Sequence, residues 1–389
     1  MAFARAAPSS GRFVLVIMRG ALDGLAAVPP LGDRDYRELR RELALHPPGE
    51  PGGALPLDGF FGLHPALPFL QQCYAARELT VLHALASPYR ERSHFDGQDL
   101  LENGSVRPHA LASGWLNRAL GQLPPPLPRE AGVALGQNVP LIMRGSAAVT
   151  SWSPSRLNAL DEDTLARLTD LYAGDALLSG RLADGLTAAA MLAEEPPPAE
   201  AMGPAQAPAA PAQLRAAQAR YAQLVQAAAG FLREEEGPRV AVFDTSGWDT
   251  HANEGAAEGQ LAGRLRALDE GLALLKRSLG PSWNDTAVLL VTEFGRTVAV
   301  NGTRGTDHGT ASAAFLLGGA VAGGRVLSDW PGLAPRSLYQ GRDLQPTMDL
   351  RSAFKGILAE HLGVSTRALE TDVFPDSAAA RPLRGLLRA

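Results

Sequence analysis

The chain has 389 residues, of which 46% are hydrophobic and 20% charged, and this composition excludes a disordered or fibrous protein. Its 36 Lys and Arg residues face 41 Asp and Glu residues, for a net charge of -5. A general nucleic-acid binder is therefore excluded, because such proteins carry a basic surplus. We expect small molecules or proteins as partners, and no oligomeric state is predicted. Cys73 is the only cysteine, so His, Asp and Glu are the available metal ligands.

The first residues predict a flexible N-terminus, residues 1–12, followed by a single domain over residues 13–389. Met1 to Arg12 contains no apolar segment of the kind that a secretory signal needs. No stretch approaches the ~20 apolar residues of a membrane-spanning helix. As written, the sequence indicates a cytoplasmic protein without a membrane span.

Short apolar runs rich in β-branched residues predict strands that are buried on both faces of a mainly parallel sheet. In chain order these runs are Phe13–Met18, Leu79–Ala84, Arg239–Phe243, Ala287–Thr292 and Ala314–Leu317. Each is too short for a membrane segment and lacks the periodicity of a surface helix. They predict the core of one large sheet.

Helices are predicted by leucine spacing and by Ala/Leu-rich composition. Between the third and fourth strands, leucines recur at steps of three and four from Leu261 to Leu279, which gives a helix with one apolar face. A strand–helix–strand unit of this kind requires parallel strands. Residues 161–192 and 213–236 are also predicted to be helical, and the Pro/Ala-rich residues 194–211 are predicted to form the loop between them. The fold class is therefore α/β, with helices flanking a mainly parallel central sheet.

Polar residues cluster directly after the predicted strands, where open α/β sheets bind their ligands. These positions supply carboxylates, imidazoles, guanidinium groups and a hydroxyl. They are Arg19 and Asp23 after the first strand, Ser93, His94 and Asp96 after the second, Asp249 and His251 after the third, and Glu293, Arg296, Asp307 and His308 after the fourth.

Asp249 and His251 are two residues apart in a Gly/Trp-containing loop, so both side chains can turn toward one cation such as Zn²⁺. The alternative is a helix cap beside a surface histidine. His308 is a candidate third ligand, and Asp307 either orients His308 or is another ligand. Glu293 ends a buried strand and needs a cation there; the alternative is a structural pair with Arg296.

Ser93 begins a predicted short helix that ends at Asn103-Gly104. The field of a helix N-terminus favours an anionic oxygen, so Ser93 is a candidate nucleophile. The alternative is an ordinary serine cap. Arg90 and Arg92 beside it are candidates to hold an oxyanion, or are solvated surface charges.

These motifs together resemble a bacterial family known only as domain of unknown function 1501, with the fold of the alkaline phosphatase and sulfatase superfamily. The resemblance spans nearly the whole chain. It rests on Arg19–Leu25, Leu57–Pro65, Ser93–Asp96, Gly247–Ala252, Thr292–Thr297 and Gly302–Gly309, with Gly318-Gly319 and Gly323-Gly324 after them. It implies an alkaline-phosphatase-like three-layer sandwich and, because family members commonly carry a twin-arginine export signal, a periplasmic location.

The resemblance also implies roles for single residues. It implies that Asp23 is the first metal ligand, Ser93 the nucleophile, Asp249 and His251 a ligand pair, Glu293 the next carboxylate and His308 the last imidazole. Three departures affect this reading. The pair is spaced more closely than usual, Glu293 stands where relatives have Asp, and Phe294 stands where many have His or Asn. The second metal would lose a ligand.

The resulting expectation is a hydrolase of small-molecule phosphate or sulfate esters that depends on a divalent metal, expected to be one or two zinc ions. Ser93 would attack the ester, and Arg92 or Arg296 would hold its equatorial oxygens. The alternative is a catalytically degenerate member of the superfamily that binds a ligand or partner without turnover.

Overall fold

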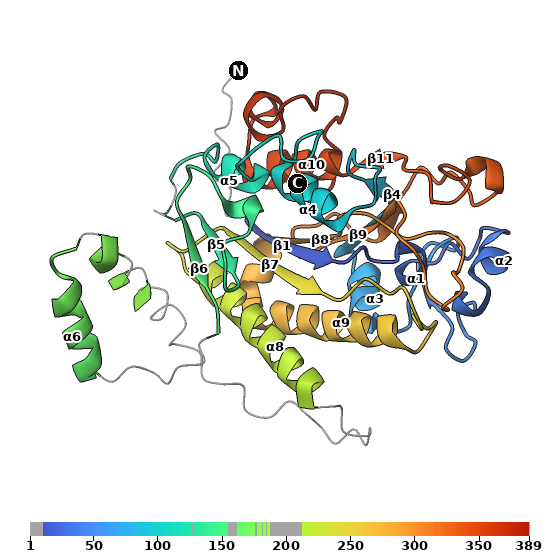
Figure 1. The fold of residues 1–389 in the computed structure, drawn as a ribbon, viewed down its shortest axis with the longest axis horizontal. Coiled ribbons are helices and arrows are strands. Elements are labelled where there is room, and N and C mark those ends of the chain that lie inside the picture. The colour runs from blue at the N-terminus through green and yellow to red at the C-terminus, as the bar shows by residue number, and fades with distance from the viewer. Residues whose placement is uncertain are drawn as a thin grey trace.

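The computed structural model describes residues 11–126, 128, 130–154, 162–175, 177–180, 182–183, 185–186 and 212–388. Among these residues the chain forms an α/β fold in which helices cover both faces of a nine-stranded, mostly parallel sheet. Figure 1 shows α8 and α9 on one face and α4, α5 and α10 on the other. This arrangement confirms the predicted fold class.

The strands of the main sheet are ordered β10-β4-β9-β8-β1-β7-β5-β6, and β11 pairs with β4. Their bounds are Arg12–Arg19 (β1), Leu79–Ala86 (β4), Gly132–Leu135 (β5), Val149–Trp152 (β6), Val240–Ser246 (β7), Thr286–Val291 (β8), Ser312–Leu317 (β9), Arg325–Leu327 (β10) and Met348–Asp349 (β11). Leu55–Pro56 (β2) and Gly62–Leu63 (β3) form a separate antiparallel pair.

The helices are Gly24–Ala27 (α1), Tyr36–Arg40 (α2), Pro68–Ala75 (α3), His94–Asn103 (α4), Trp115–Leu120 (α5), Glu162–Tyr172 (α6), Ala212–Arg233 (α8), Gln260–Leu279 (α9), Leu350–Leu362 (α10) and Thr366–Ala368 (α11). Short 3₁₀ helices cover Arg41–Leu43 (η1), Leu141–Met143 (η2), Gly280–Asp285 (η3) and Pro335–Ser337 (η4), and a π-helical turn covers Leu369–Val373 (η5).

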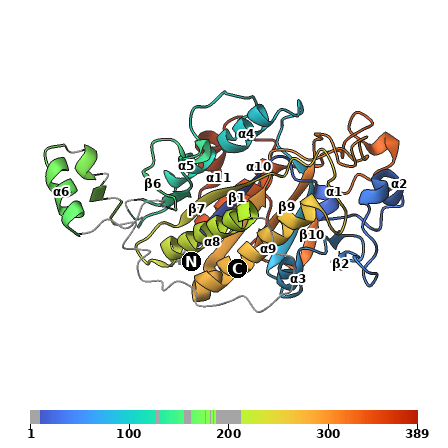
Figure 2. The same cartoon turned by 60° about the horizontal axis from the view of Figure 1, so that its bottom comes forward.

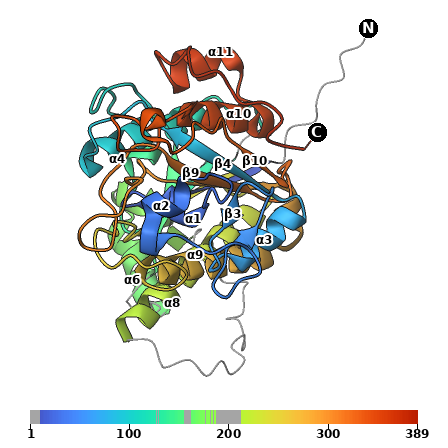
Figure 3. The ribbon, with the colours of Figure 1, turned by 90° about the vertical axis from the view of Figure 1, so that its right-hand side faces the viewer.

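Strand β1 lies in the middle of the sheet and divides its side chains between two cores. Val14, Val16 and Met18 pack in the core that includes α8 and α9, whereas the alternate residues Leu15 and Ile17 pack in the core that includes α5 and α10. This alternation follows from the period of two in a strand, and it explains why the sequence is continuously apolar here. Figures 2 and 3 show the two helical layers from other sides.

The strand directions bring several chain segments to one edge of the sheet. Strands β7 and β8 both pair with β1 in parallel, so all three end at the same edge. Strand β9 runs antiparallel to β8 and to β4, so β4 also ends at that edge and β9 begins there. Residues just before β9 therefore lie beside residues just after β1, β4, β7 and β8.

The predicted strands match β1, β4, β7, β8 and β9, and the leucine-rich helix matches α9. Four further strands of the main sheet, β5, β6, β10 and β11, are too short to stand out in the sequence, because each has two to four residues whose pairing is set by the sheet. Residue 12, predicted as part of the N-terminus, is the first residue of β1. The predicted loop 194–211 and residues 1–10 lie outside the described residues.

No helix among the described residues is long and apolar enough to cross a membrane.

Candidate metal centre

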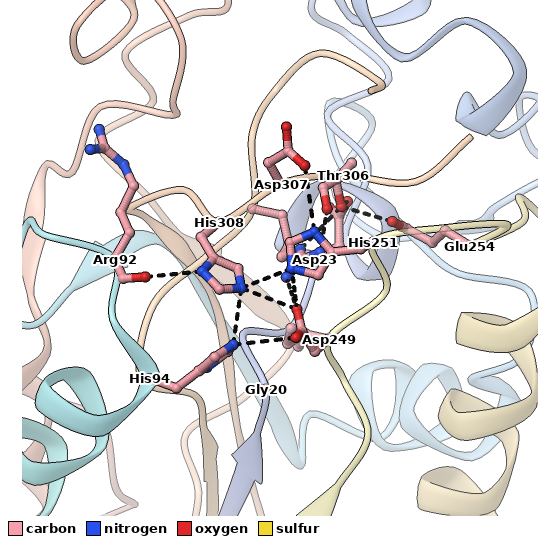
Figure 4. Close-up of polar contacts among 12 residues, drawn as sticks. Gly20, Asp23, Arg92, His94, Asp249, His251, Glu254, Thr306, Asp307 and His308 are labelled. Atoms are coloured by element: carbon pink, nitrogen blue, oxygen red, sulfur yellow. Dashed lines mark hydrogen bonds and ion pairs between the residues drawn. The ribbon is translucent and has the colours of Figure 1, made fainter. Parts of the chain in front are cut away.

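Three histidines and one aspartate meet at the edge where the strands end, and we call them the histidine group: His94, Asp249, His251 and His308 (Figure 4). The Nε2 atom of His308 lies 3.0 Å from Nε2 of His94 and 3.0 Å from Nε2 of His251. The Asp249 Oδ1 atom lies 3.2 Å from His308 Nε2 and 3.0 Å from His251 Nε2. One ligand atom each from His94, Asp249 and His308 lie within 4.8 Å of one another.

The opposite nitrogen of each imidazole faces an oxygen acceptor. His94 Nδ1 lies 2.9 Å from Oε1 of Glu293, and His308 Nδ1 lies 2.9 Å from the carbonyl oxygen of Arg92. His251 Nδ1 lies 3.4 Å from a carboxylate oxygen of Asp307. The oxygen acceptors on Nδ1 suit the tautomer that carries its proton there, and this tautomer offers an Nε2 lone pair to a metal beside the Asp249 carboxylate.

In that tautomer, neighbouring Nε2 atoms at 3.0 Å are both acceptors and cannot bond to one another. A cation between them resolves the conflict. Zinc bound at ~2.0–2.1 Å by tetrahedral ligands would hold its ligand nitrogens about 3.3 Å apart, which is close to the observed spacing. The donor set therefore fits a divalent metal with imidazole and carboxylate ligands, and the oxygen acceptors on Nδ1 are the partners that such ligands usually have.

The pKa values of the histidine group are shifted in different directions. The hydrogen bond to Glu293 raises the pKa of His94. Burial, together with the charge of His94, lowers the pKa of His308. Burial would raise the pKa of Asp249, but the hydrogen bond and charge of Arg296 outweigh it and lower that pKa. Asp249 is thus an ionised ligand candidate, and His308 favours the neutral form that a metal binds.

Arg296 positions Asp249 and does not pair with Glu293. Its buried guanidinium donates from Nη1 to Asp249 Oδ1 at 2.5 Å and from Nη2 to the carbonyl of Thr306. The alternative of a structural Glu293–Arg296 pair is therefore not what the structure contains. The guanidinium predicted to hold an ester oxygen is bound to the chain itself.

Glu293 lies behind His94 rather than in the histidine group. Its Oε1 accepts from the backbone N–H of Gly20 at 2.8 Å and from Nε2 of Gln98 at 3.1 Å, in addition to its contact with His94. Burial opposes ionisation, yet these hydrogen bonds, that of His94 first, lower the pKa of Glu293. Glu293, predicted as a metal ligand, is here bonded to His94 and to two N–H donors.

Asp23 belongs to a second, buried group, which we call the Arg40 cluster: Asp23, Arg40, Glu254 and Thr306. Arg40 Nη2 donates to Asp23 Oδ2 at 2.6 Å, and Thr306 Oγ1 donates to Glu254 Oε2 at 2.8 Å. All four side chains are at most 1% exposed. Asp23, predicted as the first metal ligand, thus has a guanidinium as its cation.

The two carboxyls of the Arg40 cluster have pKa values shifted in opposite directions. Burial favours the neutral form of Asp23, but the charge of Arg40 lowers the pKa of this carboxyl. Burial and the nearby Asp23 charge raise the pKa of Glu254. Ionisation is thus favoured in Asp23, which is bonded to Arg40, and disfavoured in Glu254. Arg40 was missed by sequence reasoning because α2 lies in a polar stretch without a readable motif.

Ser93 occupies the N-cap position of α4, as predicted, and Gly104 caps the other end in a left-handed conformation with φ of 71°. The Ser93 hydroxyl makes no capping hydrogen bond to the helix. Its neighbour Arg92 points the other way: Nε donates to Asp343 Oδ2 at 2.7 Å and Nη2 to Gln340 Oε1 at 2.7 Å. The Arg92 guanidinium is therefore turned from the histidine group, and only its carbonyl reaches His308.

His94 is the functional candidate that sequence reasoning left without a role. It follows Ser93 in the same motif, so its position after a strand was visible. Its pairing with Glu293 and His308 was not, because those residues come from a distant loop. Asp307, considered as an orienter of His308, contacts His251 instead.

A family model matches residues 82–372 and is described as a protein of unknown function, DUF1501. The chain belongs to the DUF1501 family. The DUF1501 match includes the whole histidine group, with Glu293 and Arg296, whereas Asp23 and Arg40 precede it.

No curated protein matches this DUF1501 chain. Solved structures with some similarity include Ps i-CgsB in complex with k-i-k-neocarrahexaose, which is 10% identical over 96% of this chain and 77% of that chain, with a TM-score of 0.44. Another is a Bacteroides thetaiotaomicron protein described with the metabolism of multiple glycosaminoglycans, 10% identical over 96% of this chain and 75% of that chain, with a TM-score of 0.37.

Proposed function

We propose that the chain is a metal-dependent hydrolase of small-molecule phosphate or sulfate esters. The observation that carries the proposal is the set of imidazole Nε2 atoms and Asp249 oxygens that face one another while each Nδ1 is committed to an oxygen acceptor. His94, Asp249 and His308 are the proposed ligands, and His251 stands beside them. Zinc is the proposed ion, because it prefers imidazole and carboxylate together.

A bound divalent ion would supply positive charge for an ester oxygen and for a nucleophile. The chain's own residues prepare that position. Glu293 and the Arg92 carbonyl hold two imidazoles in one tautomer, and Arg296 keeps Asp249 ionised and fixed. The ligands are thus held in place by partners that are themselves buried or part of the backbone.

Ser93 is the proposed nucleophile. Its position supports this role, because it precedes the proposed ligand His94 and stands at the N-terminus of α4, where the helix field favours an anionic oxygen. Its hydroxyl is not used to cap the helix. These features, with the motifs quoted above, also support the proposal that the chain belongs to the alkaline phosphatase and sulfatase superfamily.

The test has two parts. Metal analysis of the purified protein should find zinc or another divalent ion, and His308→Ala should lose it. A panel of phosphate and sulfate esters, assayed with zinc, magnesium, manganese and calcium, should then find a substrate. Protein with full metal content that cleaves no ester on the panel would contradict the hydrolase.

Ser93→Ala should abolish that hydrolysis without loss of metal or fold. Removing a hydroxyl at a helix cap costs at most ~1 kcal/mol of stability. Ser365→Ala is the matched control, because Ser365 caps α11 through its side chain and lies in another part of the chain. Wild-type turnover in Ser93→Ala would place the nucleophile elsewhere.

A second candidate is a catalytically degenerate member that binds a ligand or partner at its metal without turnover. The observation that favours it is the commitment of the predicted guanidinium groups: Arg296 pairs with Asp249, and Arg92 pairs with Asp343. Neither is left to hold an ester. Full metal content with no turnover on the panel would identify this function.

A further inference from the structure

A cavity of about 800 Å³ lies beyond the carboxyl ends of β5 and β7, next to α8 and α9. Its inner wall is apolar. It is formed by the side chains of Leu135, Val242, Phe243, Leu224 and Leu268, among others. A cavity of this size accommodates a small organic molecule, and the apolar wall favours one with a hydrocarbon body.

Three arginines line the same cavity, and two of them have no acidic partner among the residues that the structure describes. Arg19 is engaged, since it pairs with Asp244 and with Glu102. Arg264 donates only to the backbone carbonyl of Ser246, at 3.4 Å. Arg220 makes no ion pair within the described part of the chain. Since the one carboxylate of the lining is already paired, the lining carries an uncompensated positive charge.

Tyr221 adds a buried polar group. Its hydroxyl oxygen is inaccessible to solvent and has no hydrogen-bond partner among the described residues, although the residue lines the cavity. Since solvent in the cavity does not reach this oxygen, Tyr221 contributes its ring to the cavity wall, and the charged head of a ligand is left to the arginines.

We propose that this cavity binds an organic anion: a single carboxylate, sulfate or phosphate head held by Arg264 and Arg220, on an apolar body that lies against the inner wall. Guanidinium groups recognise all three heads through paired N–H donors, so they define the class by charge and shape. The proposal is independent of ester hydrolysis, because no residue of the histidine group lines the cavity.

The experiment is calorimetric titration of the full chain, with its metal, by octyl sulfate, octyl phosphate and octanoate below their micelle concentrations. At least one of these three should bind, and its comparison with the other two identifies the preferred head. Octanol and inorganic sulfate should each bind at least tenfold more weakly, because each lacks one half of the ligand. Equal binding of octanol would overturn the role of the arginines.

Two variants test the place of binding. Arg264→Gln should weaken binding about tenfold, the loss expected for one charge-assisted contact. Arg266→Gln is the matched control, because it removes the same charge from an exposed residue of α9 that does not line the cavity. Equal effects of the two variants would reduce the interaction to nonspecific charge attraction and overturn the proposal.

Gly263→Leu fills the cavity from the same helix. A Cβ at Gly263 meets nothing within 4 Å, so the larger side chain can extend into the cavity without a backbone clash. Leucine also favours the helix over glycine, so folding should be retained, as circular dichroism would verify. Binding should fall at least tenfold. Unchanged binding by this folded variant would place the anion elsewhere.

Discussion

The histidine group and the Arg40 cluster lie at the same edge of the sheet, and they differ in the groups that surround their carboxylates. In the Arg40 cluster the chain supplies its own cation, and Arg40 and Asp23 are bonded at 2.6 Å without access to solvent. In the histidine group, Arg296 pairs with Asp249 in the same way, but Nε2 of His308 also lies 3.0 Å from Nε2 of His94 and from Nε2 of His251. The comparison teaches that a guanidinium neutralises a carboxylate in both groups, whereas only the histidine group brings imidazole nitrogens together in the arrangement for which we propose a metal.

The largest expected effect is on stability, from removing the internal cation. Arg40→Met leaves the Asp23 carboxylate buried without its partner, which should lower the free energy of unfolding by about 3–5 kcal/mol, as measured by urea denaturation. Arg37→Met on the same helix is the control and should stay within about 0.5 kcal/mol, because Arg37 is exposed. Equal stability of both variants would show that the cluster does not need its cation.

The next effect concerns the proposed metal. Zinc at 100 times its dissociation constant should raise the free energy of unfolding by about 2.7 kcal/mol, because the folded chain binds it and the unfolded chain does not. In His308→Ala this stabilisation should disappear, whereas it should remain in His46→Ala, since His46 is exposed and pairs with Glu50. Thermal unfolding with and without zinc measures both. The same zinc response in His308→Ala would contradict the proposed ligand set.

A smaller effect is expected from a residue that only orients a ligand. Glu293→Gln replaces the carboxylate that accepts from His94 Nδ1, and outer partners of this kind typically contribute a factor of 10–100 to metal affinity. Competition with a chromogenic chelator measures the change. Glu270→Gln, an exposed site on α9, is the control. Affinity equal to wild type in Glu293→Gln would remove His94 from the ligands.

The last effect is a pH dependence in the Arg40 cluster. The pKa of Glu254 is raised above its value in the unfolded chain by burial and by Asp23, so the folded chain holds a proton that the unfolded chain has lost. Stability should therefore fall as pH rises from about 5 toward 8. Glu254→Gln removes this titration, so its stability relative to wild type should increase over the same range. Parallel stability profiles for the two proteins would show that Glu254 is ionised in the fold.

An element of the fold can be predicted from the sequence when its signal lies within the element itself. Strand β1 and helix α9 are predictable, because apolar continuity and leucine spacing are local properties. The four-residue strands β5 and β6 are not, since their pairing is decided by the sheet around them.

The same limit applies to the site. Candidate site residues could be found because they follow strands, and this position identified Asp249 and His308. Their partners are set by contacts between distant segments: Arg40 with Asp23, and His94 with Glu293. These pairs cannot be predicted from sequence spacing. Asp23 and Glu293 were therefore predicted as metal ligands, whereas Asp23 is bonded to a guanidinium and Glu293 to an imidazole.

The reversed direction of β9 has a consequence for how this site can change. Because β8 ends and β9 begins at the same edge, the connection between them leaves the sheet and returns to it within one surface segment that carries Glu293, Arg296 and His308. Both ends of the segment are held by neighbouring strands, and its exposed tip is tied to the loop after β7, because the Thr303 and Arg304 carbonyls accept from the backbone N–H groups of Asn253 and Glu254. A change of length at the tip would therefore also displace the loop that carries His251, so the two loops must change together.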